Sequence, residues 1–531
     1  MIKTRSIFLR VSIFFLISTA INISTPVAAQ ELEIRIADSK GDWGAPNPFH
    51  HYPRGPGYVR MSWIFDTLIW KDQSGYIPAL ATKWLYDPER MVFCFHLNPR
   101  AKWHDNTPLT AADVVFTLAY FKKHPYHWIS TAPIKTAKAL NPHSVEIHLA
   151  TPYASFLSDI GGSMPILPRH IWENVKEPHS FSAPEAFIGS GPYRFVDFNK
   201  AQGSYLFKAF ADYYQGRPKA DRLIYFRSGR PLVSLSTRQA DLCSIDADMA
   251  QSLENNGFVV IRNERGVNRK LMLNHRKAPF NQKNFRQALA LAIDRQEIIA
   301  KSQRGFGTPA SYGLLSIDHP MYNPDTPVYH FNLSEARRLL ETLGYQRATD
   351  GFYHREGQPL EVQLLSSSFS ATGQGAPDRD AQVIKKQLEN LGVRVELIAL
   401  EQATADSKIQ NWEFDLAVSG HGGLCGDAKI LNEMIASSYG AGSVNSARYD
   451  ENPELNQLLE MQMREMDKNA RTKIVYRIQE LYAEELPAIS LYYPFSLSAY
   501  NPHKGIDWFY TKGGIGKGIP IAQNKMSLIR P

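Results

Sequence analysis

The sequence predicts a protein of the α/β class, because its helices and strands follow one another in a regular order. The apolar residues of 383–391 repeat with the period of a helix, Gly392 is placed to end that helix, and the alternating strand 393–397 follows directly. The chain has 531 residues, of which 44% are hydrophobic, so it is several times longer than a usual domain. We therefore expect two or three lobes, each with its own packed core.

Further elements along the chain repeat this pattern. Alternation of apolar and polar residues predicts strands at 32–36 and 145–149. Thr110, with Asp113 three residues later, is typical of a capping box that starts a helix. The same spacing of cap and acid starts a second helix at Asn332.

The first residues have the pattern of a secretion signal. Three cations lie among the first ten residues, and an apolar run over 11–23 follows, which is too short to cross a bilayer as a helix. Val27-Ala28-Ala29 supplies the small residues that precede a cleavage site, so residues 1–29 are expected to be removed. No cysteine lies near that site, so we expect a periplasmic protein without a lipid anchor.

Charge and cysteine content exclude several classes of protein. Lys and Arg number 59 against 52 for Asp and Glu, and they form no dense basic run, so nucleic acid is not an expected partner. Cys94, Cys243 and Cys425 are the cysteines of the chain, and no CxxC spacing occurs. At most one disulfide can form, and whether Cys94 and Cys243 meet is left open. A structural zinc site has no support.

The common catalytic motifs are missing from the sequence. No HExxH, GxSxG or Walker A motif occurs. The glycine-rich stretch 512–518 looks like a phosphate loop, but Gly518 stands where Ser or Thr is required. The stretch 305–310 fits GxGxxA in letters only, because Pro309 blocks the turn into a helix. We expect no enzymatic activity and no cofactor, and we keep a secreted hydrolase of unrecognised type as a distant alternative.

Five segments of the chain are similar to motifs of one family. They are residues 103–114 (WHDNTPLTAADV), 189–193 (GSGPY), 212–221 (DYYQGRPKAD), 274–295 (NHRKAPFNQKNFRQALALAIDR) and 486–492 (LPAISLY). In number and order these segments resemble the extracellular solute-binding proteins of family 5. That family delivers peptides, and in some branches nickel complexes, to ABC importers. The segment 274–295 also predicts a strand, a proline turn and a helix with a buried apolar face.

The resemblance implies a two-lobed periplasmic binding protein fold, type II-like, with an extra subdomain in the first lobe. The implied segments are a signal peptide 1–29, first lobe 30–55, extra subdomain 56–184, first lobe again 185–268, second lobe 269–489 and a first-lobe return 490–531. The implied function is capture of a peptide or peptide-like solute between the lobes, for delivery to the permease and ATPase subunits of an importer. The resemblance implies no catalysis, and we expect a monomer.

One loop of the second lobe departs from the family pattern. In peptide-binding members this loop carries a tryptophan and, three residues later, an aspartate that pairs with the α-amino group of the peptide. His421 and Leu424 stand at these positions here, so the usual partner of the amine is missing. Asp427 either substitutes for it or forms a structural turn. The residues of this loop expected to bind ligand are His421, Gly422, Gly423, Cys425 and Asp427.

The loop after the first strand is expected to form the other side of the pocket. Its aromatic residues, which offer apolar and stacking area, are Trp43, Phe49, Tyr52 and Tyr58. Arg54 is placed to hold a ligand carboxylate bidentately.

A second interpretation uses the same scaffold for a nickel–chelator complex. His421 is then a metal ligand, because imidazole suits Ni(II) and a chelator fills the other positions. Cys425 in the same loop supports this interpretation. In the first interpretation no metal is bound.

Overall fold

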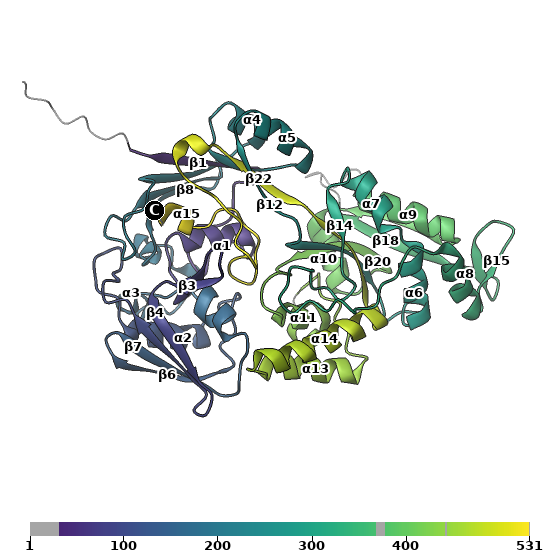
Figure 1. Cartoon of the computed structure of the whole chain (residues 1–531), viewed down its shortest axis with the longest axis horizontal. Helices are drawn as coiled ribbons and strands as arrows, with labels where there is room; N and C mark the ends of the chain where they lie inside the picture. The colour runs from purple at the N-terminus through teal and green to yellow at the C-terminus, as the bar shows by residue number, and fades with distance from the viewer. Residues whose placement is uncertain (1–30, 368–377, 441–442, 530–531) are drawn as a thin grey trace, which may run out of the picture. The chain divides into compact units, whose positions relative to one another are not determined.

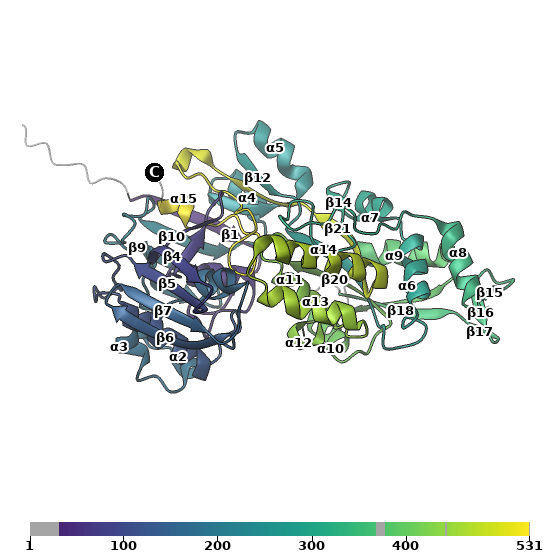
Figure 2. The ribbon, with the colours of Figure 1, turned by 60° about the horizontal axis from the view of Figure 1, so that its bottom comes forward.

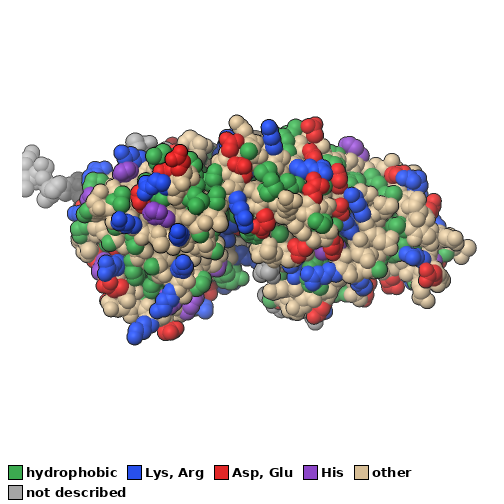
Figure 3. Space-filling view, turned by 90° about the horizontal axis from the view of Figure 1, so that it is seen from below, with side chains coloured by type: hydrophobic (Ala, Val, Ile, Leu, Met, Phe, Trp, Pro, Cys, Tyr) green, Lys and Arg blue, Asp and Glu red, His purple; other side chains and the backbone are tan. Residues whose placement is uncertain are grey.

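The computed structural model describes residues 31–367, 378–440 and 443–529, and the structural statements below concern these residues. The predicted signal segment 1–29 lies outside them. Within the described part of the chain, no helix is long and apolar enough to cross a membrane. On the face drawn in Figure 3, Lys and Arg side chains are interspersed with Asp and Glu, as the sequence leads one to expect.

A seven-stranded sheet is built from three separate stretches of sequence. In spatial order its strands are β12 (Val259–Asn263), β22 (Ser496–Tyr500), β11 (Leu242–Ile245), β1 (Glu33–Asp38), β10 (Arg222–Arg227), β9 (Ser204–Ala209) and β8 (Tyr193–Asn199). β1 pairs in parallel with β10 on one side and β11 on the other. The strand predicted at 32–36 is confirmed, since Ile34 and Ile36 of β1 are fully buried.

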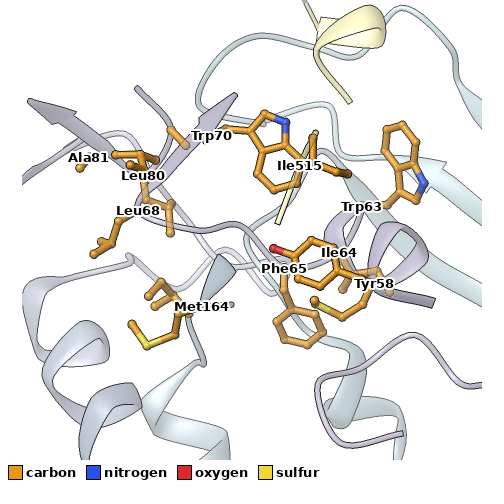
Figure 4. Packing of buried hydrophobic residues seen from close by; sticks show 14 of the residues in the cluster. Tyr58, Trp63, Ile64, Phe65, Leu68, Trp70, Leu80, Ala81, Met164 and Ile515 are labelled. Carbon is orange, nitrogen blue, oxygen red and sulfur yellow. The ribbon is translucent and has the colours of Figure 1, made fainter. Parts of the chain in front are cut away.

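A four-stranded sheet shares a core with the seven-stranded sheet. Its strands are β4 (Ala81–Asp87), β5 (Val92–Leu97), β7 (Ser144–Leu149) and β6 (Ile134–Asn141), and α2 (Ala111–Lys123) packs on it. The predicted capping box is confirmed, because the Thr110 backbone N–H donates to the Asp113 carboxylate at 2.8 Å. Figure 4 shows part of this core, to which Trp63, Phe65 and Met164 belong. We call the two sheets and their core the first lobe.

A six-stranded sheet forms the centre of what we call the second lobe. Its order is β14 (Gly307–Pro309), β21 (Ala488–Pro494), β13 (Val267–Leu273), β20 (Leu416–Gly422), β18 (Glu361–Ser367) and β19 (Arg394–Leu400). Its helices include α6 (Lys283–Ala292), α8 (Leu333–Thr342) and α9 (Arg379–Leu391). The apolar face predicted for 285–293 is buried against this sheet, and Gly392, with φ of 111°, ends α9 as predicted.

Three further helices form a separate core of the second lobe. They are α11 (Lys429–Ile435), α13 (Pro453–Arg464) and α14 (Lys468–Glu485). In Figures 1 and 2 they lie beside one another on the part of the second lobe that faces the first. The remaining elements are α1 (Gly55–Ser62), β2 (Ile69–Lys71), β3 (Tyr76–Pro78), η1 (Leu157–Gly161), α3 (Arg169–Trp172), η2 (Pro178–Ser180), η3 (Pro184–Phe187), α4 (Pro231–Ser236), η4 (Ala247–Met249), α5 (Ala250–Asn255), α7 (Arg295–Ser302), β15 (Gln346–Arg347), β16 (Tyr353–Arg355), β17 (Gln358–Pro359), α10 (Gln402–Gln410), α12 (Ser437–Gly440), η5 (Pro502–Lys504) and α15 (Met526–Ile529).

The chain passes between the two large sheets twice. It leaves the seven-stranded sheet after β12 and enters the six-stranded sheet at β13, and it returns at Phe495, between β21 and β22. The segment after β22 then runs over the first lobe near α1 (Figure 1). The domain boundaries implied at 268 and 489 lie close to these passages and stay a prediction.

Candidate functional site

A cavity of about 1090 Å³ lies between the two lobes. The first lobe contributes the end of β1, the loop before α1, the end of β11 and residues 519–523 of the return segment. The second lobe contributes residues of β13, β18, α10 and β20, with Val444 and Asn445. Both lobes therefore wall one space of the size that proteins use to hold small molecules.

Three predicted residues of the first loop line this cavity: Trp43, Tyr52 and Arg54. The Trp43 indole N–H donates to Asp38 at 2.7 Å, which fixes the ring. The Lys40 ammonium lies over both aromatic rings, 4.3 Å from the centroid of Trp43 and 4.0 Å from that of Tyr52. These side chains give the cavity a flat apolar surface beside a positive charge.

Among the cations that line this cavity, Arg54 is the one least engaged by the described residues. Its side chain is exposed and makes no hydrogen bond or ion pair with any described residue. By contrast, Arg60 is buried and paired with Asp38 at 2.6 Å, and Arg269 is paired with Asp380 at 2.9 Å. No described residue engages the Arg54 guanidinium, and its binding of a ligand carboxylate stays a prediction.

The other two aromatic residues of the predicted pocket wall lie in the core instead. Phe49 packs against Phe121 and Trp172, and Tyr58 is fully buried, stacks on Trp128 at 4.6 Å and donates its hydroxyl to the Ser163 carbonyl at 3.2 Å. Neither lines the cavity. An aromatic side chain buries more area in a core than on a cavity wall, and the sequence does not separate the two environments.

His421 lies near the end of β20, opposite Asn268 of β13, and does not line the cavity, although its neighbour Gly420 does. Its Nδ1 is buried and has no hydrogen-bond partner among the described residues. Burial lowers the pKa of His421 to about 3, and the nearby charges of Lys270 and Arg54 act in the same direction. The imidazole is therefore neutral, but its surroundings are cationic and oppose a bare metal ion.

Asp427 does not face the cavity. Its carboxylate accepts hydrogen bonds from Arg471 at 2.7 Å, from the Ser155 hydroxyl at 2.7 Å and from the Lys429 backbone N–H at 2.9 Å. Burial raises its pKa, but the charge of Arg471 and the hydrogen bonds from Arg471, the Lys429 backbone and Ser155 together outweigh burial and lower the pKa to about 2. The carboxylate is already fully engaged where the two lobes meet, which favours the structural interpretation. Leu424, in place of the usual aspartate, is buried in the core of the second lobe.

The remaining predicted loop residues contact the protein itself. The Cys425 thiol donates to the Arg265 carbonyl at 3.1 Å, and burial raises its pKa. Gly422 lies beside Pro520, and Gly423 lies against the backbone of Lys517. All three cysteines, Cys94, Cys243 and Cys425, are free thiols, so the disulfide that the sequence leaves open is not formed.

Most residues that line the cavity were not predicted from the sequence. The missed residues include Lys40, Asp246, Ser366, Asp406, Asn445, Tyr510 and residues 519–523. They come from seven places in the chain and share no motif, so only the tertiary fold brings them together. Within the described part of the chain, no group of three or more His, Cys, Asp or Glu side chains is arranged to hold a metal ion.

Comparison with known proteins identifies the family. The model of the bacterial extracellular solute-binding proteins, family 5, middle region, matches residues 75–443, more than half of the chain. The chain belongs to this family. Among curated relatives, the heme-binding protein A of Haemophilus influenzae is 25% identical over 478 residues, which cover 83% of this chain and 84% of the relative. The dipeptide-binding protein of Escherichia coli is 24% identical over 448 residues, covering 78% and 80%.

Solved structures of this family share the fold. NikZ from Campylobacter jejuni, in complex with Ni(L-His), superposes with a TM-score of 0.76 at 22% identity, covering 91% of this chain and 97% of that chain. The oligopeptide-binding protein AppA from Bacillus subtilis, in complex with a nonapeptide, gives a TM-score of 0.72 at 22% identity, covering 88% and 94%. The predicted resemblance to family 5 and the two-lobed periplasmic binding protein fold are confirmed.

Proposed function

We propose that this protein is the periplasmic solute receptor of an ABC importer and that it captures a peptide or peptide-like solute in the cavity between its lobes. The observation that carries the proposal is the cavity itself, which both lobes wall and in which the Arg54 side chain pairs with no described residue. Members of the family are binding proteins, and we propose that this one also releases its solute unchanged. Its partners are then a permease with its ATPases, and it acts as a monomer after export.

Capture by two lobes follows from differential binding. A solute that touches both walls of the cavity binds the closed arrangement more tightly than the open one, so it shifts the population toward closure. Trp43 and Tyr52 supply stacking area on one wall, and Ser419 and Asn445 supply polar groups on the other. The Ser419 hydroxyl donates to the Asn445 side-chain oxygen at 2.6 Å, which leaves the Asn445 amide N–H groups available.

The cavity binds the two ends of a peptide differently from the usual family pattern. Arg54 offers a partner for a carboxylate, whereas Asp427 is engaged by Arg471 and does not line the cavity. The acids that do line it and are not in ion pairs are Asp246 and Asp406, and Asp406 accepts from Gln402 at 2.7 Å. We propose that an α-amino group, where the solute has one, is neutralised on this side of the cavity instead of at Asp427.

One observation favours a nickel–chelator complex as a second candidate. His421 Nδ1 is unpartnered among the described residues and belongs to a neutral imidazole, which is the form that ligates metals. Because Arg54 and Lys270 make the surroundings positive, the metal has to arrive with an anionic chelator. The relative NikZ binds Ni(L-His) on the same fold.

Native mass spectrometry of protein taken directly from the periplasm, with metal analysis of the same sample, tests both candidates. An organic mass retained without stoichiometric metal supports the first candidate, and nickel near one per chain with a small chelator supports the second. Arg54→Gln is expected to lose the retained solute. Arg100→Gln, an exposed arginine on the first lobe, is the matched control and is expected to keep it. Conversion of the solute by the protein contradicts both candidates.

A further inference from the structure

The return segment of the chain forms a short turn with an unusual concentration of glycine. Ile515 and Ile519 pair through backbone hydrogen bonds of 2.9 and 2.8 Å, and Gly516, Lys517 and Gly518 make the turn between them. Ile515 is buried in the first lobe beside Trp70, as Figure 4 shows. The turn is therefore fixed to the first lobe, and its tip projects from that anchor.

The tip of this turn lies directly on the backbone of the second lobe. A Cβ added at Gly518 would lie 2.7 Å from the Gly423 carbonyl oxygen and 2.9 Å from the Gly423 Cα. In return, a Cβ added at Gly423 would lie 2.7 Å from the Lys517 carbonyl oxygen, and one at Gly426 would lie 2.9 Å from the Gly518 Cα. Real Cβ contacts are longer than this, so only glycine permits the two backbones to approach so closely.

A second contact lies beside the first. A Cβ added at Gly513 would lie 2.5 Å from the Cys425 carbonyl oxygen. We call the contacts of Gly513 and Gly518 with the loop 423–426 the glycine clasp. It joins two segments that are about ninety residues apart in the sequence, and each side is backbone that cannot rotate out of the way.

Two spaces between the lobes lie near the glycine clasp. One is the ligand cavity, lined by Gly420 and residues 519–523. The other is a chamber of about 30 Å³, room for one or two water molecules, lined by Gly516, Gly518 and Asp427 among others. Gly518 of the clasp lines the chamber, whereas Ile519, the next residue in the chain, lines the ligand cavity.

Polar contacts between the lobes surround the chamber. Ser155 of the first lobe donates to Asp427 at 2.7 Å, Lys429 pairs with Asp159, and the Ala154 backbone N–H donates to the Met463 carbonyl at 2.8 Å. Side chains such as Lys429 can adjust to small changes in separation. The glycine clasp has no such freedom, so it sets how closely the lobes meet.

We propose that the glycine clasp is the contact that limits closure of the two lobes: its docking completes closure, so a solute is held firmly only where the clasp forms. This inference rests on the proposed function. A methyl group at Gly518 or Gly423 then acts as a wedge, which keeps the lobes apart without changing any residue that lines the cavity. The wedge therefore lowers the affinity for solute, while the stability of the ligand-free open protein is unaffected.

Matched glycine variants test the proposal, because other glycines have the same backbone conformation in open space. Gly518 has φ of 74°, and Gly505, with φ of 66°, has no atom within 4 Å of its added Cβ. Gly423, with φ of 92°, is matched in the same way by Gly257, with φ of 81°. Alanine at the control positions carries the cost of a positive φ without the clash.

The measurements are thermal shift and calorimetric titration of full-length mature protein. The probes are pooled tripeptides and the Ni(II)–L-histidine complex. Gly518→Ala and Gly423→Ala are expected to lose at least tenfold in affinity for the probe that wild type binds, while their ligand-free melting temperatures equal those of Gly505→Ala and Gly257→Ala. If Gly518→Ala binds the probe with wild-type affinity, the proposal about the glycine clasp is wrong. An equal loss in Gly505→Ala also overturns it.

A second readout needs no solute. Ser155→Cys with Asp427→Cys places two thiols where the hydroxyl and carboxylate oxygens are 2.7 Å apart, so in the presence of an added thiol oxidant, oxidised glutathione, a disulfide accumulates when the lobes close. Adding Gly518→Ala is expected to slow its formation at least tenfold, and adding Gly505→Ala is expected to leave it unchanged. If wild type binds neither probe, the proposed function fails. The rates of disulfide formation still test the proposal about the glycine clasp. Equal rates in the two variants overturn it.

Discussion

Asp427→Asn is expected to weaken the fold of the second lobe and to leave the recognition of an amine unchanged. The substitution keeps an acceptor for Ser155 but removes the negative charge beside Arg471. The Arg471 side chain is 7% exposed, so its guanidinium is left in the interior without a counter-charge, with the oxygens of Gln462 and the Ser155 hydroxyl as neutral partners. A buried cation that loses its counter-charge is costly, because desolvation is no longer offset.

The size of the effect follows from the pKa of the carboxyl group. A folded pKa of about 2, against 3.8 for an ordinary aspartate, corresponds to about 2 kcal/mol of unfolding free energy. Because the pKa is lowered in the folded state, this stabilisation is complete above pH 4 to 5 and is lost as the pH falls toward 2. The difference between wild type and Asp427→Asn is therefore expected to be constant from pH 7 to 5 and to narrow below pH 4.

Urea denaturation of the ligand-free proteins at a series of pH values measures this difference. Asp318→Asn is the control, because Asp318 pairs with Arg265 at 3.0 Å at an exposed site, where an ion pair contributes less than about 1 kcal/mol. A free energy of unfolding within 0.5 kcal/mol of wild type at pH 7, on the order of measurement error, refutes the reasoning about the ion pair. A selective loss of free-amine probes, with N-acetylated probes unaffected, shows instead that Asp427 binds the amine.

Three further outcomes follow from single side chains of the site. Arg54→Gln is expected to reduce affinity for carboxylate-bearing solutes by about tenfold or more, while affinity for their amides, measured by calorimetry, stays unchanged. Burial lowers the pKa of Lys270 to about 7, so stability measured by thermal unfolding is expected to rise from pH 7 to 9, and Lys270→Met is expected to abolish that rise. His421→Ala is expected to abolish binding of Ni(II)–L-histidine if the nickel interpretation holds, and unchanged affinity in a titration with that complex removes His421 as a ligand.

Local elements of the fold were predictable from the sequence because they depend on near neighbours. The helix α6 has its apolar residues at helical spacing, and Phe285 and Leu289 are fully buried as that spacing predicts. The residues that begin and end helices depend on even nearer neighbours in the sequence. Thr110 begins α2, and Gly392 ends α9. The family resemblance supplied the two-lobed arrangement, which local patterns alone do not determine.

The cavity was predicted only in part, because its walls meet through tertiary structure. Trp43 and Arg54 line it, but Phe49 and Tyr58 belong to the core, and an aromatic residue in a loop has the same sequence signature in both places. The sequence argued against a phosphate loop in the glycine-rich stretch 512–518. Its contact with the loop after β20 follows from backbone proximity between distant segments, which no local pattern encodes.

The central claim is that a solute is bound between the lobes and leaves unchanged. Its most direct test is calorimetric titration of stripped protein with the solute released from the periplasmic sample, followed by mass analysis of the solute after incubation. The account predicts one solute bound per chain, recovery of the same mass, and a loss of affinity in Arg54→Gln but not in Arg100→Gln. A changed mass, or full affinity in Arg54→Gln together with Trp43→Ala, contradicts it.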